Sequence, residues 1–207
     1  MNTKDRKVHW EKIYNTKNLN EVSWYQPIPT TSLNFLEQFK IPKSAKIIDV
    51  GGGDSFFVDH LLKHGYTDIT VLDISEAALE RAKKRLSEDA SKIKWIVADA
   101  ANFEPTEVYD FWHDRATFHF LTSETEIDQY LETAQKHLSK NGHLILGTFS
   151  DQGPLKCSGI EIRQYTEITM ADTLKRFFEK IQCIRVNHET PFDTTQNFLF
   201  CSFKKRI

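Results

Sequence analysis

The clearest chemical signal in this chain lies between residues 47 and 54, which read Ile-Ile-Asp-Val-Gly-Gly-Gly-Asp. A β-branched run ends at Asp49, and three glycines follow: Gly51, Gly52 and Gly53. Apolar residues at helical spacing then begin at Phe57. Glycines at a strand-to-helix turn let the backbone approach a ligand closely, and the first N–H groups of a helix are unpaired. The stretch therefore predicts a site for the polar part of a nucleotide-like cofactor.

A second acid stands at the end of the next strand-like run. The run 69–73 ends in Asp73, about twenty residues past the glycines. An acid at that distance can accept the hydroxyl hydrogens of a ribose. The alternative is that Asp73 caps the helix that starts near Ser75. The preceding glycine turn favours the ribose role.

The elements that position these residues alternate from about residue 45 onwards, which indicates a parallel sheet covered on both faces. Ser123 marks the start of a helix, and Asn141-Gly142 marks its end and the turn into another strand. The expected strands of the alternating part are 45–50, 68–73, 93–98, 108–113 and 143–149.

The last third of the chain has a different pattern. Thr166 is expected to cap a helix, and two strand-like runs follow at 181–188 and 197–203. Their short connection implies an antiparallel pair. We therefore predict an α/β fold with a single Rossmann-like, doubly wound sheet, mostly parallel and closed by an antiparallel C-terminal hairpin. We expect one domain over residues 1–207, with a helical and aromatic N-terminal segment at 1–40 and the core at 41–207.

Composition and charge exclude several classes of protein. The chain has 207 residues, a formal charge of −2 and a pI near 6.4, so no polyanion-binding surface is expected. The N-terminus lacks the apolar stretch of a secretory signal, and no apolar run approaches membrane-spanning length. We expect a cytoplasmic protein without nucleic-acid or membrane partners, and a monomer by default.

Three cysteines leave an odd count without metal-ligand spacing, so no metal site is expected. Cys183 and Cys201 lie in apolar, strand-like runs and are expected to be buried, reduced thiols. Cys157 lies in a loop that contains glycine and proline, and there it could be exposed.

Together these motifs resemble class I S-adenosylmethionine-dependent methyltransferases, and the resemblance covers most of the chain. In that family a D/E-x-G-x-G-x-G loop surrounds the methionine portion of the cofactor. The loop here starts at Asp49, and Ser55 replaces its last glycine. The resemblance implies that Asp73 binds the ribose hydroxyls and that Ile74 packs against the adenine. It also places Asp99 at the adenine amino group and Ala100 at the ring edge.

The same resemblance matches 108–113 to the family's fourth strand and places Asp114 and Arg115 beside the methionine end of the cofactor and the acceptor pocket. Two stretches, 24–27 and 112–121, look like the citrate synthase lysine methyltransferase group and its bacterial relatives. That closer similarity suggests a protein lysine as acceptor. A small molecule with a thiol, amine or carboxylate is equally plausible, because acceptors vary widely on one fold.

Four residues near the fourth strand are candidates for the chemistry. Arg115 could hold a carboxylate of the cofactor or acceptor, or it could pair with Asp114 or a surface acid. His113 and His119 are candidate bases, since histidine titrates near neutrality, and a structural role is the alternative for both. Methyl transfer from a sulfonium needs no covalent nucleophile or metal, and it needs a base only if the acceptor arrives protonated.

Aromatic residues also gather before the sheet. Trp24 and Tyr25 precede a stretch that prolines stiffen. With Trp10 and Tyr14 they predict a lid over the cofactor, and packing at the edge of the core is the alternative.

Two other functions have discriminating features. A nicotinamide-dependent oxidoreductase would carry G-x-G-x-x-G, but Phe56 occupies the final glycine position here. A non-catalytic cofactor-binding module would keep every cofactor-side residue, so only turnover separates it from an enzyme.

Overall fold

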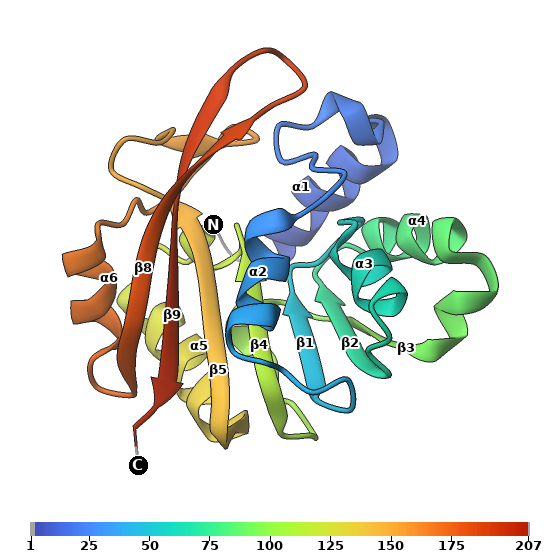
Figure 1. Cartoon of the computed structure of the whole chain (residues 1–207). Coiled ribbons are helices and arrows are strands. Elements are labelled where there is room, and N and C mark those ends of the chain that lie inside the picture. The colour runs from blue at the N-terminus through green and yellow to red at the C-terminus, as the bar shows by residue number, and fades with distance from the viewer. Residues whose placement is uncertain (1–2, 207) are drawn as a thin grey trace.

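A computed structural model describes residues 3–206 and shows one seven-stranded sheet (Figure 1). The strand order is β3-β2-β1-β4-β5-β9-β8. Only β9 runs against the others, because it pairs antiparallel with both β5 and β8. The predicted sheet and its C-terminal hairpin are therefore confirmed. The strands are β1 (Lys46–Val50), β2 (Asp68–Asp73), β3 (Ile93–Val97), β4 (Tyr109–Arg115), β5 (Leu138–Phe149), β8 (Phe178–Glu189) and β9 (Thr195–Lys205).

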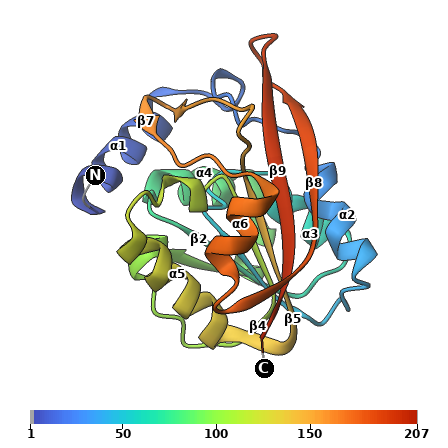
Figure 2. The ribbon, with the colours of Figure 1, turned by 90° about the vertical axis from the view of Figure 1, so that its left-hand side faces the viewer.

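Helices cover both faces of the sheet (Figures 1 and 2). Apolar residues of α2 (Thr30–Gln38), α3 (Phe57–Lys63) and α4 (Glu76–Leu86) pack against one face. Those of α5 (Glu124–His137) and α6 (Glu167–Leu174) pack against the other. The remaining elements are α1 (Thr3–Thr16), a small hairpin of β6 (Lys156–Cys157) and β7 (Ile160–Glu161), and four 3₁₀ turns: η1 (Leu19–Glu21), η2 (Ser87–Lys92), η3 (Ala100–Asn102) and η4 (Phe118–Phe120).

Hydroxyl side chains fix the starts of three helices. Ser75, Ser123 and Thr166 each accept a hydrogen bond from the backbone N–H three residues later, at the first turns of α4, α5 and α6. A cap of this kind contributes about 1 kcal/mol. The predicted starts at Ser123 and Thr166 are confirmed, and the side chain that caps α4 is Ser75 rather than Asp73.

The predicted end of a helix at Asn141-Gly142 is wrong. Helix α5 ends at His137, and β5 already begins at Leu138. The pairing of β5 with β4 then skips from Leu138 to His143. A Cβ on Gly142 would lie 2.8 Å from Cγ of Leu138, so the chain folds back on itself at this point. The Asn-Gly pair therefore forms a bulge inside the strand.

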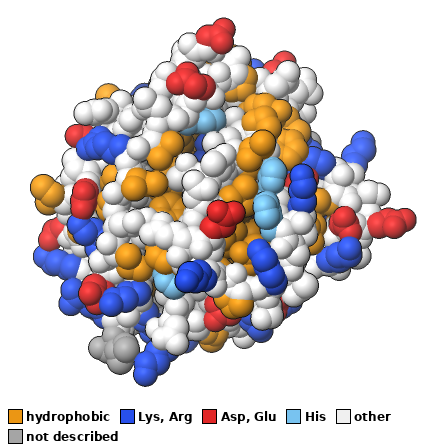
Figure 3. Space-filling view, viewed as in Figure 1, with side chains coloured by type: hydrophobic (Ala, Val, Ile, Leu, Met, Phe, Trp, Pro, Cys, Tyr) orange, Lys and Arg blue, Asp and Glu red, His pale blue; other side chains and the backbone are white. Residues whose placement is uncertain are grey.

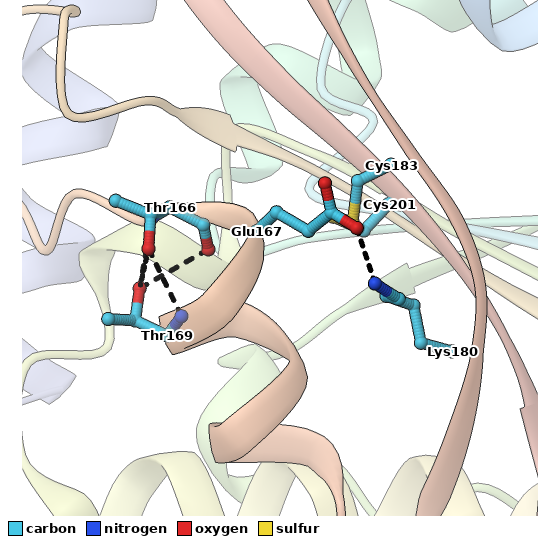
Figure 4. Close-up of a disulfide and its surroundings, with 6 residues drawn as sticks. All are labelled: Thr166, Glu167, Thr169, Lys180, Cys183 and Cys201. Carbon is cyan, nitrogen blue, oxygen red and sulfur yellow. Dashed lines mark hydrogen bonds and ion pairs between the residues drawn. A yellow bond between two sulfur atoms is a disulfide. The ribbon is translucent and has the colours of Figure 1, made fainter.

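The expectation of reduced thiols at Cys183 and Cys201 is also wrong. A disulfide joins them across β8 and β9, next to the ion pair of Lys180 with Glu167 of α6 (Figure 4). The two cysteines stand opposite one another in the antiparallel register, with Cα atoms 4.1 Å apart. Their pairing depends on that register, which the apolar pattern of each strand alone does not define.

Successive residues of β4 point to opposite faces of the sheet, as the pleat requires. His113 packs against Phe57 of α3, with ring centroids 4.2 Å apart. Trp112 and Asp114 instead both contact the Tyr130 hydroxyl of α5. This alternation decides which chemically capable residues of β4 reach the site described below.

The surface carries no dominant charge on the face shown in Figure 3, where acidic and basic side chains are interspersed. No helix within residues 3–206 is both long and apolar enough to cross a membrane.

Candidate cofactor and acceptor site

A cavity opens at the carboxyl ends of β1 to β4, where the expected cofactor motifs converge. Its empty space, counted together with the solvent at its mouth, is about 920 Å³. Its walls contain Asp49, Gly51, Gly52, Asp73, Ile74, Asp99, Ala100, His113 and Arg115 from the expected residues. Residues from distant parts of the sequence complete them: Arg6, Trp10, Tyr14, Trp24, Phe120 and Cys157.

The glycine turn is held by backbone contacts. The N–H groups of Gly51 and Gly52 both donate to the carbonyl of Leu72, at 2.7 and 3.1 Å. Gly51 has a φ of +68°, and a Cβ there would lie 1.6 Å from Oγ1 of Thr117. Gly51 is therefore required twice, by its backbone conformation and by the close approach of Thr117.

Asp73 is a buried carboxylate at the cavity wall. Its Oδ1 accepts a hydrogen bond from the backbone N–H of Ser75, at 2.8 Å. Burial, reinforced by the charges of Asp54 and Asp49, raises the pKa of Asp73 from 3.8 to about 7. The ligand-free protein thus holds this acid at the edge of protonation near neutral pH.

Asp99 is buried and only partly satisfied. Its Oδ1 accepts hydrogen bonds from Nη1 of Arg6 and from the backbone N–H of Ala101, both at 3.1 Å. Its Oδ2 is buried and has no hydrogen-bond partner within residues 3–206. An unpaired acceptor in a cavity is suited to an N–H donor of a ligand.

His113 belongs to a buried chain of polar contacts. One ring nitrogen, Nδ1, lies 2.7 Å from Oδ1 of Asp49, and the other, Nε2, lies 2.8 Å from Oγ of Ser32 on α2. Both nitrogens therefore have protein partners. The contact orients Asp49 at the start of the glycine turn, so His113 is suited to positioning rather than to proton transfer.

Arg115 lies partly buried at the end of β4. Its Nη1 donates to the carbonyl of Trp24 at 3.1 Å, and its Nη2 has no partner within residues 3–206. Its guanidinium carbon lies 5.0 Å from the ring centroid of Phe198 on β9. Burial lowers the pKa of Arg115 to about 10. Asp114 does not pair with it, so that alternative for Arg115 is wrong.

Asp114 and His119 are not brought to the cavity. Asp114 accepts hydrogen bonds from the backbone N–H groups of Thr117 and Phe118 and from the Tyr130 hydroxyl. It thereby fixes the turn after β4. Nδ1 of His119 accepts from the backbone N–H of Phe149, and burial lowers the pKa of His119 to about 3. It is a neutral core residue, as the structural alternative supposed.

Helix α1 lies across the cavity and is attached to the core by ionic contacts. Glu11 accepts hydrogen bonds from the first backbone N–H groups of α4, and Arg81 donates to the carbonyls of Tyr14 and Lys17. Arg6 bridges Asp99 and Glu126. The first aromatic residues of the chain are thereby held over the site.

The aromatic wall contains three of the four expected lid residues. Trp10 contacts Trp24 and Phe120 edge to face, with centroids 5.7 and 5.1 Å apart, and Tyr14 packs beside Trp24. Tyr25 instead packs against Phe56, away from the main cavity. Closure of this wall after cofactor binding stays a prediction.

The structure also shows where Gly53, Ser55 and Cys157 lie relative to the cavity. Gly53 has a φ of +50° and lies under Tyr14, whose hydroxyl would be 2.7 Å from an added Cβ. Ser55, in place of the family glycine, lines the cavity, and its Oγ accepts from the N–H of Phe57. Cys157 lines the cavity too and is buried, so its expected exposure is wrong.

Sequence reasoning missed Arg6, Ser32 and Phe120 as parts of the site. Arg6 and Ser32 carry no motif. Arg6 reaches the cavity, and Ser32 reaches His113, only because α1 and α2 fold back over the sheet. No local sequence pattern, such as a helix cap, could have indicated either residue.

Comparison with known proteins finds similarity to methyltransferases. Residues 47–142 match the family model described as a methyltransferase domain. The chain also superposes on the N-methyltransferase NodS of Bradyrhizobium japonicum, solved in complex with S-adenosyl-L-homocysteine, with a TM-score of 0.70, 17% identity and full coverage of both chains. Residues 47–142 are thus similar to a methyltransferase domain, and the chain shares the fold of NodS.

The names of curated relatives of this chain contain different acceptors. The chain is 31% identical over 111 residues to malonyl-[acyl-carrier protein] O-methyltransferase 1 of Ilyobacter polytropus, covering 53% of this chain and 40% of that protein. It is 34% identical over 108 residues to EEF1A lysine methyltransferase 2 of Danio rerio, covering 51% and 45%. The chain thus spans less than half the length of these relatives. They support the methyltransferase interpretation and not the oxidoreductase one.

Proposed function

We propose that the protein transfers a methyl group from S-adenosylmethionine to an amine, thiol or carboxylate acceptor. The observation that carries the proposal is the pair of buried acids at neighbouring strand ends, Asp73 on β2 and Asp99 after β3, beside the glycine turn of β1. Along the sheet edge, Asp73 comes before Asp99, which matches the order of ribose and adenine in an adenosyl group.

The residues fit an adenosyl group at each point. The orphaned Oδ2 of Asp99 would accept from the adenine amino group, and Ala100 and Ile74 would border the ring. Asp73, once ionised, would accept both ribose hydroxyls. Gly51 and Gly52 line the cavity and add no side chain to it.

The sulfonium of the bound cofactor supplies an activated methyl group, so the chain itself must orient the reactants and exclude water. Orientation can lower a barrier by about 7–11 kcal/mol in favourable cases. Trp10, Trp24 and Phe120 form an apolar wall that would exclude solvent. Asp49, held by His113, supports the turn beneath the reacting end.

The acceptor is either a protein lysine, the kind that the name of one relative contains, or a small molecule. The nearer resemblance to the citrate synthase lysine methyltransferase group stays a prediction, as do the single domain and the monomeric state. A cytoplasmic location is also part of the proposal. Reducing compartments disfavour disulfides, so the oxidation state of Cys183 and Cys201 in the cell tests this location.

Calorimetric titration with S-adenosylhomocysteine tests the adenine assignment. We expect Asp99→Asn to weaken binding at least about tenfold, since a charge-assisted hydrogen bond contributes about 1.5–3 kcal/mol. The exposed Asp128→Asn is the matched control and should bind as the unchanged protein does. Equal affinity in all three proteins would contradict the assignment.

A further inference from the structure

Arg115 lines the cavity, and the mechanism above does not use its charge. Its Nη2 is buried and unpartnered, and its only hydrogen bond within residues 3–206 is to the neutral carbonyl of Trp24. No carboxylate within residues 3–206 forms an ion pair with it. The charge of Asp49 favours the charged form of Arg115 without forming an ion pair with it, so Nη2 is left as a donor for an anionic group.

The chemistry of the guanidinium narrows the class of ligand that Arg115 can bind. Its planar fork of N–H donors matches the two oxygens of a carboxylate. The guanidinium lies over the ring of Phe198, which supports one face of the plane. Nη2 has no hydrogen-bond partner within residues 3–206, and the Arg115 side chain lines the main cavity.

The position along the sheet separates Arg115 from the adenosyl residues. Asp99 follows β3, Asp73 ends β2, the glycine turn follows β1, and Arg115 ends β4, the next strand in the sheet. Its side chain extends still further, toward Phe198 of β9. The free donor thus lies on the far side of the glycine turn from the ribose and adenine acids.

The cavity also lacks a free imidazole base. His113, the only histidine of residues 3–206 on the cavity wall, has both ring nitrogens engaged, and His119 lies in the core. An ammonium acceptor must lose a proton before it can attack, and the charge of Arg115 would repel it. A carboxylate carries a free lone pair at neutral pH and needs no base.

We propose that the methyl acceptor is a small carboxylic acid, bound as its carboxylate by Arg115. This inference rests on the proposed function and gives it a substrate class. An acceptor oxygen forms the new O–C bond with its own lone pair, while the S–C bond breaks and leaves its electron pair on sulfur. The products are a methyl ester and a neutral thioether, and no proton is transferred.

Binding to the complex with S-adenosylhomocysteine tests the proposal. The probes are butyrate, benzoate and phenylacetate, each compared with its amide, and butylamine as the ammonium probe. We expect the acids to bind the complex at least about tenfold more tightly than their amides. Arg115→Gln should abolish that preference and Arg115→Lys should reduce it, whereas the exposed Arg176→Gln should leave it unchanged.

The second arm distinguishes the acceptor carboxylate from the cofactor's own. S-adenosylhomocysteine carries a carboxylate, and 5′-methylthioadenosine does not. If Arg115→Gln weakens the first about tenfold and leaves the second unchanged, Arg115 binds the cofactor and the proposal is overturned. Equal binding of acids and amides to the unchanged protein, or preference for butylamine, overturns it without any variant. Failure of the unchanged protein to bind S-adenosylhomocysteine would instead refute the proposed function.

Discussion

Replacing Asp73 by asparagine should make the ligand-free protein more stable while removing its affinity for the cofactor. The pKa of Asp73 is raised from 3.8 to about 7 because the carboxylate is buried beside Asp54 and Asp49. At about 1.4 kcal/mol per pKa unit, the ionised side chain costs the folded state about 4 kcal/mol. The introduced amide must itself be buried, at about 1–2 kcal/mol. We expect a net gain of about 2–3 kcal/mol at pH 8.

The sign of the pH dependence follows from proton binding. Between pH 4 and pH 7 the folded protein holds a proton on Asp73 that the unfolded chain has released. The stability of the unchanged protein therefore falls as the pH rises through this window. Asp73→Asn removes that dependence, so its advantage should be present at pH 8 and absent near pH 4.

Urea unfolding at the two pH values measures the stability change, and calorimetric titration with S-adenosylhomocysteine measures the functional loss. Two charge-assisted hydrogen bonds to the ribose would be weakened, which should raise the dissociation constant about 100-fold. Asp128→Asn, at an exposed position, should change neither quantity. If Asp73→Asn is no more stable at pH 8, the burial argument is refuted. If its affinity is unchanged, the ribose role is refuted.

Three further changes test separate parts of the structure. Gly51→Ala should abolish cofactor binding in a titration, because a Cβ there would overlap Thr117 Oγ1, and a soluble variant with native affinity would contradict the geometry. Cys183→Ser should lower the free energy of unfolding by about 3 kcal/mol in urea, since the disulfide to Cys201 closes a loop with a sequence separation of 18, and reductant should then have no further effect. His119→Phe should keep turnover and flatten the loss of stability below pH 6.5. The lowered pKa of His119 means that the unfolded chain gains a proton there as the pH falls, whereas the folded one does not until about pH 3. Lost turnover would restore a catalytic role for this histidine.

The cofactor side of the site could be predicted because its signals are local. A strand, a glycine turn and an acid at a fixed distance lie within one βαβ unit, and the chain direction alone brings Asp49, Asp73 and Asp99 to one sheet edge. The same holds for the helix starts at Ser123 and Thr166, where a cap acts on its own first turn.

The missed features depend on contacts between distant segments. The disulfide needs the register of β8 on β9, and the bulge at Asn141-Gly142 needs the pairing of β5 with β4. Arg6 reaches Asp99 across 93 positions of sequence. A residue's face on a strand also decides its role, since Asp114 and Arg115 are adjacent in sequence but only Arg115 reaches the cavity.

Thermal unfolding with S-adenosylhomocysteine, and with NADH in parallel, tests the central claim most directly. A ligand present at a hundred times its dissociation constant should add about 2.7 kcal/mol to the stability of the folded protein. The account predicts a shift to higher temperature with S-adenosylhomocysteine and none with NADH. A shift with NADH alone would contradict the assignment of the glycine turn, and with it the proposed methyl transfer.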